Sequence, residues 1–357
     1  MCLFEKPYKS CTLQAVRAAV LLTTVTMKQL VEGFIQQLRH AIEIGERATV
    51  TFAGPPYANV VLAGMGSSGV GGNIVQSYVA DKLSVPVIVN KGYSLPAFVS
   101  PNTLFIATSF SGNTEETLSA VREAMEAEAS VGFITTGGEL LRMAQENNMP
   151  HIVVPGGSGQ PRASLGYFLV QQLYLLYYAG LLDDTFKTEL SQSVNLLEEQ
   201  IGSIKVQASA LANAFQGKLP VLYASDAFEP VALRLQQQLN ENAKQLAHVN
   251  ALPEMNHNEV EGWQCPEKLF GQPVVLTMKT SYDHPRVRLR MDLTKKVLEQ
   301  KKQDVLEVEA VGATLLEQML YLVHLSDWVS VYLAELNSAN PNTIDSINYL
   351  KGEISKV

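Results

Sequence analysis

The chain has 357 residues, a formal net charge of −8 at pH 7, and a composition that is 46% hydrophobic and 17% charged. This length exceeds that of a typical single core and favours two domains of about 150 residues each. The composition is that of globular proteins and argues against disorder. No cluster of lysine and arginine stands out in this acidic sequence, so a nucleic-acid-binding surface is not expected.

Three cysteines and two apolar stretches bear on the cellular compartment. Cys2, Cys11 and Cys265 form no Cys-x-x-Cys pair and are odd in number, which favours a reduced, cytoplasmic chain without a disulfide framework. Residues 15–26 and 168–182 are both shorter than the roughly 20 apolar residues that a membrane-spanning helix needs. The first stretch also lacks the cleavage site of a signal peptide. We therefore expect two buried helices in a soluble protein that has no membrane partner.

Helical and strand patterns alternate along the first half of the chain. Residues 1–57 are expected to be mainly helical, with apolar residues at helical spacing over 27–46, until two prolines end the pattern. Short apolar runs then alternate with helices, which is typical of parallel strands covered on both faces. The expected strands are residues 60–63, 85–89, 103–108, 131–135 and 152–154.

A second cycle of the same pattern follows a long helical zone at residues 165–216. An apolar helix at 314–336 and a short final helix beginning at Pro341 close the chain. The expected strands of this cycle are residues 221–224, 247–251, 274–278 and 305–308.

These patterns predict an α/β fold with two tandem, flavodoxin-like, doubly wound parallel sheets and flanking helices. The expected domains are an N-terminal helical segment at residues 1–57, a first sheet domain at 58–185, and a second at 186–357.

A glycine-rich loop, GMGSSGVGGN at residues 64–73, follows the first expected strand. Its glycines let the backbone turn tightly and approach a ligand, and the helix behind it directs free N–H groups at an anion. The candidate phosphate-binding residues of this loop are Gly66, Ser67 and Ser68. Taken alone, the loop also matches a dinucleotide-binding fingerprint.

A second loop, SFSGNTEET at residues 109–117, follows the third expected strand and is crowded with hydroxyl groups. Ser109, Ser111 and Thr114 surround a glycine just before a helix, and neutral hydroxyls at a helix N-terminus bind a phosphate monoester without a basic residue. A plain helix N-cap is the alternative. Two such loops at the carboxyl ends of successive strands favour a ligand.

From about residue 60 to the C-terminus, the sequence resembles the bifunctional phosphoglucose/phosphomannose isomerases of the sugar-isomerase (SIS) superfamily. The hydroxyl loop alone marks only the superfamily. Three later stretches indicate this branch: GQPRASLGY at 159–167, residues 240–263, and INYLKGE at 347–353. The resemblance implies two SIS domains, a homodimer, and no metal or other cofactor.

The resemblance also assigns catalytic roles. It places Arg162 in the active site, makes Glu241 the base, makes His257 the group that opens the sugar ring in the neighbouring subunit's site, and carries a catalytic lysine onto Lys351. From the residues alone, more ordinary interpretations exist. Arg162 would pair with a local carboxylate, and Glu241 would be a solvated carboxylate paired with Lys244 or Gln245. His257 would be a surface or structural histidine, and Lys351 would be a solvated charge in the C-terminal tail.

Together these residues fit an isomerase that interconverts glucose 6-phosphate, mannose 6-phosphate, or both, with fructose 6-phosphate. One carboxylate moves a proton between adjacent carbons through an enediol. His257 and Lys351 would move protons on the ring oxygen and hydroxyl, and Arg162 would stabilise the enediolate. The six histidines are scattered without metal-binding spacing, so no metal is expected.

Two positions depart from the family pattern: Ser67 stands where a glycine is usual, and Asn73 where an acid is usual. Thr343 is the candidate for the small polar residue linked to acceptance of both epimers, and the epimer preference stays open.

The main alternative function is a non-catalytic SIS protein that binds sugar phosphates and regulates a partner. Such a sensor would keep the hydroxyl loop but would not need the four candidate catalytic residues. A ketose-amine isomerase and a dinucleotide-dependent dehydrogenase are weaker alternatives. The first lacks an amine-handling device, and in the second Asp81 follows the glycine loop too closely to bind a ribose.

Overall fold

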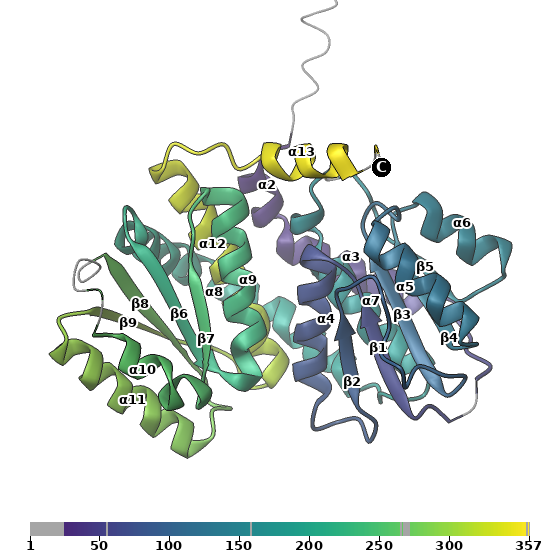
Figure 1. Cartoon of the computed structure of the whole chain (residues 1–357), viewed down its shortest axis with the longest axis horizontal. Helices are drawn as coiled ribbons and strands as arrows, with labels where there is room; N and C mark the ends of the chain where they lie inside the picture. The colour runs from purple at the N-terminus through teal and green to yellow at the C-terminus, as the bar shows by residue number, and fades with distance from the viewer. Residues whose placement is uncertain are drawn as a thin grey trace, which may run out of the picture.

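The computed structural model describes residues 25–54, 56–157, 159–264, 266, 272–354 and 356. The three cysteines, and most of the helix expected at residues 15–26, lie outside this described part. Figure 1 shows two α/β halves side by side, each built on its own parallel sheet.

Sheet A has five parallel strands, and its chain order reverses between β1 and β3, as in doubly wound folds. Every residue of β3 is buried, because helices cover both faces of the sheet. In spatial order the strands are β2 (Val87–Asn90), β1 (Asn59–Ala63), β3 (Thr103–Ser109), β4 (Ser130–Thr135) and β5 (His151–Val153).

Two layers of helices enclose sheet A. Alternate residues of β1 enter two different apolar clusters, one on each face, as the period of two in a strand requires. One face packs against α3 (Phe34–Arg47), α4 (Gly66–Val79) and α7 (Leu165–Tyr178), and the other against α5 (Glu115–Glu126) and α6 (Gly138–Glu146).

Sheet B repeats the order of the first four strands of sheet A, so that β6 takes the place of β1 and β8 the place of β3. Helix α9 (Glu229–Gln238) lies on its inner face, and α10 (Glu259–Gly262) and α11 (Pro285–Gln300) lie on its outer face. In spatial order its strands are β7 (His248–Leu252), β6 (Leu219–Ser225), β8 (Pro273–Lys279) and β9 (Asp304–Glu309).

Two long helices and a continuous core join the halves. Helices α8 (Thr185–Phe215) and α12 (Leu315–Leu336) pack along each other, and nearly all of α12 is buried, which explains its apolar sequence. Helix α4 of the first half also packs against α9 of the second. The carboxyl edge of sheet A therefore lies beside the end of α9. None of the helices in the described ranges is long and apolar enough to cross a membrane.

The predicted strands are confirmed, each boundary lying within two residues of the observed one. Two predicted helices differ from the structure. The helix expected at 27–46 is divided at Gly33 into α2 (Met27–Glu32) and α3. The final helix, α13, spans Asp345–Ile354 and begins four residues after Pro341, because side chains from both halves bind the backbone carbonyls just before it.

Candidate active site

The two predicted phosphate loops meet at the carboxyl edge of sheet A. Ala63 of β1 lies opposite Ala107 of β3 in the sheet register, so both loops start from the same edge. A Cβ at Gly64 would lie 2.8 Å from the carbonyl oxygen of Thr108, so only glycine lets the loops approach this closely. Helix α4 then begins at Gly66, whose φ is +53°. The first turn of α4 therefore opens beside the hydroxyl loop.

Two of the three hydroxyl groups of the second loop contact each other, and the third accepts a bond from the loop backbone. The Ser109 and Thr114 hydroxyls lie 2.8 Å apart, and the Ser111 hydroxyl accepts a bond of 3.2 Å from the Asn113 backbone N–H. Thr114 occupies the N-cap position of α5, yet its side chain accepts no bond from that helix. Capping of α5 therefore does not account for the Thr114 hydroxyl.

Ser67, the first departure from the family pattern, connects the glycine loop to the segment that carries Arg162. Its hydroxyl donates a bond of 3.0 Å to the carbonyl oxygen of Pro161, and both Ser67 and Ser68 are buried. Asn73, the second departure, lies two turns into α4, and its side-chain amide contacts Gln76 at 3.5 Å.

Arg162 lies in the 3₁₀ turn η1 (Pro161–Ala163) and is only 2% exposed. Its Nε donates to the Asn242 side-chain oxygen at 2.7 Å, and its Nη2 donates to the Pro341 carbonyl. Its Nη1 lies 3.5 Å from a carboxylate oxygen of Glu241 and has no hydrogen-bond partner among the described residues. Burial lowers the pKa of Arg162, and the Glu241 charge opposes that shift. The guanidinium thus has one unsatisfied donor facing the predicted base.

Glu241 lies in η3 (Leu239–Ala243), a π-helical turn at the end of α9. Single π turns in helices occur often at functional sites. The side chain of Glu241 is 26% exposed, so it borders both the buried guanidinium and solvent. The expected pairing of the Glu241 carboxylate with Lys244 is not observed, because the Lys244 ammonium donates to the Glu241 backbone carbonyl at 2.6 Å. The carboxylate keeps Arg162 as its ionic neighbour.

Residues 340–344, which we call the C-terminal strap, cross this site. Three successive carbonyls of the strap, those of Pro341, Asn342 and Thr343, accept bonds from the side chains of Arg162, Gln160 and Lys244, respectively. The strap therefore places Thr343 beside the predicted base.

The strap leads into α13, which lies across the end of the molecule near α2 (Figure 1). Helix α13 has no buried residue, and Lys351 on it is exposed.

His257 is not brought to Glu241 within one chain. It lies exposed in the 3₁₀ turn η4 (Glu254–His257), which follows the carboxyl end of β7. Glu241 lies just before β7 begins, so the whole strand separates the two side chains. In Figure 1 the neighbouring helix α10 accordingly lies far from α13.

Two residues near the site were missed in the sequence. Lys91 directly follows β2, and its Cε lies 3.1 Å from the position that a Cβ at Gly69 would occupy. Lys91 could have been identified from the sequence, because it directly follows a third strand of the same sheet. Asn242 stands next to Glu241 but has no motif of its own, because its partners are distant in sequence.

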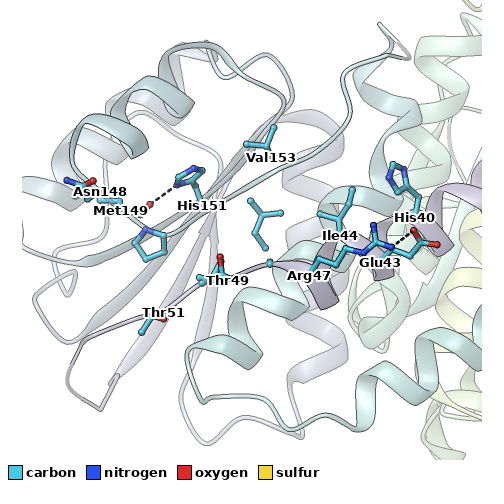
Figure 2. Close-up of a pocket in the computed structure, with 14 residues that line it drawn as sticks. His40, Glu43, Ile44, Arg47, Thr49, Thr51, Asn148, Met149, His151 and Val153 are labelled. Atoms are coloured by element: carbon cyan, nitrogen blue, oxygen red, sulfur yellow. Dashed lines mark hydrogen bonds and ion pairs between the residues drawn. The ribbon is translucent and has the colours of Figure 1, made fainter.

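A separate cavity of about 670 Å³ lies between α3 and the edge strand β5 (Figure 2). The Arg47 and Glu43 side chains form an ion pair there at 3.8 Å, and the His151 ring bonds the Met149 carbonyl at 2.8 Å. Its lining includes none of the predicted site residues. We assign the candidate site by its converging polar groups, and not by cavity size.

The candidate site combines a candidate anion cradle with an ion pair. The cradle consists of hydroxyls and helix N–H groups, and the pair is a partly exposed carboxylate beside a buried guanidinium. This arrangement suits proton abstraction next to a carbonyl in a phosphorylated substrate. No group of three metal-ligating side chains was found among the described residues.

Comparison with known proteins identifies the family. The sequence model described as the C-terminal SIS domain of bacterial phospho-glucose isomerase matches residues 204–354. A bifunctional phosphoglucose/phosphomannose isomerase from Caldicellulosiruptor bescii is 35% identical over 93% of this chain and 99% of that protein. One from Aquifex aeolicus is 39% identical over 92% and 98%, respectively. The chain belongs to the bifunctional phosphoglucose/phosphomannose isomerase family.

The fold of this family member also matches solved structures. The structure of a hypothetical protein from Thermus thermophilus aligns with a TM-score of 0.72 and 16% identity, over 96% of this chain and 92% of that one. The likeness supports the two-sheet α/β architecture. The predicted family and fold class are both confirmed.

Proposed function

We propose that this protein is an aldose–ketose isomerase that interconverts fructose 6-phosphate with glucose 6-phosphate, mannose 6-phosphate, or both. The observation that carries this proposal is the buried Arg162 guanidinium, whose unpartnered Nη1 lies 3.5 Å from the Glu241 carboxylate. Membership of the isomerase family supports the reaction class.

The substrate phosphate binds at the carboxyl edge of sheet A. The hydroxyls of Ser68, Ser109, Ser111 and Thr114 donate to its oxygens, together with the backbone N–H groups of Gly66 and Ser67 at the start of α4. This places phosphate binding in the first domain, residues 58–185, and the base in the second, residues 186–357.

Glu241 moves the proton between C1 and C2 of the open-chain sugar. Removal of the carbon-bound proton places negative charge on the substrate oxygens, and Arg162 stabilises that enediolate through Nη1. Since a fixed guanidinium supplies the positive charge, the scheme needs no metal ion. The phosphate cradle holds the chain so that one carboxylate reaches both carbons.

Ring opening requires groups that the single chain does not bring to Glu241. We assign it to His257 of a second copy of this chain, in a cytoplasmic homodimer, with Lys351 exchanging protons at the ring oxygen and adjacent hydroxyl. The exposed position of His257 in η4, with all of β7 between it and Glu241 of its own chain, supports this arrangement. Thr343, on the strap, is the candidate contact for the epimeric hydroxyl.

The test is a coupled assay in EDTA that starts from fructose 6-phosphate and reads glucose 6-phosphate and mannose 6-phosphate separately. Glu241→Gln should lower the rate by about 1,000-fold, within the usual range for removing a general base. Glu229→Gln, an exposed carboxylate at the far end of the same helix α9, is the matched control and should retain the rate.

The outcomes of this assay separate isomerase from sensor. Formation of either product, lost only in Glu241→Gln, supports the proposal. If the wild-type protein binds fructose 6-phosphate but forms neither product, the protein is a sugar-phosphate sensor, and Glu241 is an ordinary helix carboxylate.

A further inference from the structure

Asn242 follows the proposed base in sequence, contacts the Arg162 side chain and is 0% exposed. Its side-chain oxygen accepts the Arg162 Nε–H at 2.7 Å. Its side-chain nitrogen donates to the Ser330 hydroxyl at 3.0 Å. The Ser330 hydroxyl in turn donates to the Asp327 carbonyl at 2.7 Å, within α12. A continuous chain of hydrogen bonds therefore runs from a buried helix to the guanidinium.

The chemistry of this chain of bonds selects asparagine. Ser330 donates its only hydroxyl proton to the Asp327 carbonyl, so its oxygen must accept a bond from Asn242. Arg162 can only donate, so the other end of the Asn242 side chain must accept. An amide offers one donor and one acceptor at these two ends. Aspartate lacks the donor, and leucine lacks both.

The backbone of Arg162 is tied to the same buried helix. Arg234 donates from Nη2 to the Arg162 carbonyl at 2.7 Å and pairs with the Asp327 carboxylate at 3.0 Å. Gln238 donates to that carboxylate at 2.8 Å. With its backbone, Nε and Nη2 all held, Arg162 keeps only Nη1 available toward Glu241.

We infer that Asn242 is a positioning residue for isomerisation, which acts by orienting the Arg162 guanidinium so that Nη1 faces the enediolate. This inference rests on the proposed function. Glu241 and Asn242 are adjacent in one π turn. The same turn therefore positions both the base and the residue that holds Arg162. A guanidinium that is free to rotate about its stem stabilises the developing charge less well, since preorganisation is lost.

The expected signature is a loss of kcat with little change in substrate affinity. Asn242→Leu, which has a similar volume, should lower kcat by about 10- to 100-fold, less than full removal of an oxyanion donor. The dissociation constant for fructose 6-phosphate should change by less than about threefold, since phosphate binding lies in the other domain. Gln171→Leu is the control: it removes another fully buried amide, which donates to the Ala41 carbonyl at 2.7 Å, away from the site.

A double-mutant cycle decides between positioning and a general structural role. In an Arg162→Ala background, Asn242→Leu should cause almost no further loss of kcat, because the group through which it acts is gone. If Asn242→Leu lowers kcat by the same factor with and without Arg162, the inference is overturned. If Asn242→Leu does not fold, Ser330→Ala, which removes only the anchor of the amide, replaces it in the same cycle.

Failure of this inference is distinguishable from failure of the proposed function. A wild-type protein that converts no fructose 6-phosphate contradicts the function itself. An active wild type with an additive cycle contradicts only the role of Asn242.

Discussion

The loops at the carboxyl edges of the two sheets are built alike, but they place different polar groups there. In sheet A, the loops after β1 and β3 present glycines and hydroxyls toward a shared space. In sheet B, the corresponding loops after β6 and β8 surround the carboxylate of Asp283, whose side chain is fully buried. Asp283 accepts from the Ser225 hydroxyl at 2.6 Å, the Thr280 hydroxyl at 2.9 Å and the Thr280 N–H at 2.8 Å.

The comparison suggests how one loop residue changes an edge: Asp283 provides a carboxylate at sheet B, whereas the hydroxyl loop of sheet A contains no acidic residue between Ser109 and Thr114. Parallel strands direct backbone N–H groups and short polar side chains to their carboxyl ends in both halves. Sheet B meets those donors with its own carboxylate, whereas in the proposed function sheet A offers them to the substrate phosphate. Function therefore depends on the loop chemistry and not on the repeated architecture.

Among the changes that test this comparison of the two sheets, the largest expected effect comes from giving sheet A the carboxylate that sheet B has. Ser111→Asp adds a negative charge to the hydroxyl loop, and like charges close together repel the phosphate strongly. We expect the affinity for fructose 6-phosphate to fall by at least about 100-fold in a calorimetric titration, equivalent to about 2.7 kcal/mol. Ser111→Asn, of the same size but neutral, should lose less than about tenfold. Equal losses in the two variants would contradict the charge argument.

The second effect concerns the carboxyl edge of sheet B, where the Asp283 side chain is buried. Asp283→Ala removes the acceptor of three hydrogen bonds and should lower the free energy of unfolding by about 2 kcal/mol, measured by urea denaturation. Affinity for fructose 6-phosphate should stay unchanged, because the ligand binds at the other sheet. A folded Asp283→Ala protein with strongly reduced affinity would show that the two edges are not independent.

The strands and both phosphate loops were predictable because their signals are local. Short apolar runs mark β1 and β3, a glycine directly follows β1, and the hydroxyl loop lies within nine residues of sequence. That Arg162 and Glu241 lie close together was predictable only through the family resemblance, which placed both in one active site.

Contacts between distant segments were not predictable. The bond from Arg162 to Asn242 spans 80 residues, and the one from Arg162 to Pro341 spans 179. No periodicity encodes such pairs. The separation of His257 from Glu241 likewise depends on which end of β7 each adjoins, which a sequence interval of 16 residues does not reveal.

The third effect tests the junction between α3 and α12, which holds the two halves of the molecule together. His324 of α12 stacks on Phe34 of α3 at 5.2 Å, and burial lowers its pKa to about 3, from an ordinary value of 6.5. Below pH 6.5 the unfolded chain binds a proton that the folded chain excludes. The free energy of unfolding should therefore fall as the pH drops from about 6.5 toward 3. The expected slope is at most about 1.4 kcal/mol per pH unit.

Urea denaturation at pH 7, 6 and 5 measures this slope. His324→Gln, whose side chain can still accept the bond that Trp328 donates to His324, should flatten it. An unchanged slope in the variant would mean that other groups cause the acid sensitivity.

The central claim is that Glu241 transfers a carbon-bound proton of a sugar phosphate held at sheet A. The most direct measurement is nuclear magnetic resonance of the products formed from fructose 6-phosphate in D₂O. We predict that the wild-type protein places deuterium at C2 of the aldose phosphate, because a protonated carboxylate exchanges with solvent, and that Glu241→Gln forms almost no labelled product. Turnover without any deuterium at C2, or undiminished labelling by Glu241→Gln, would contradict the account.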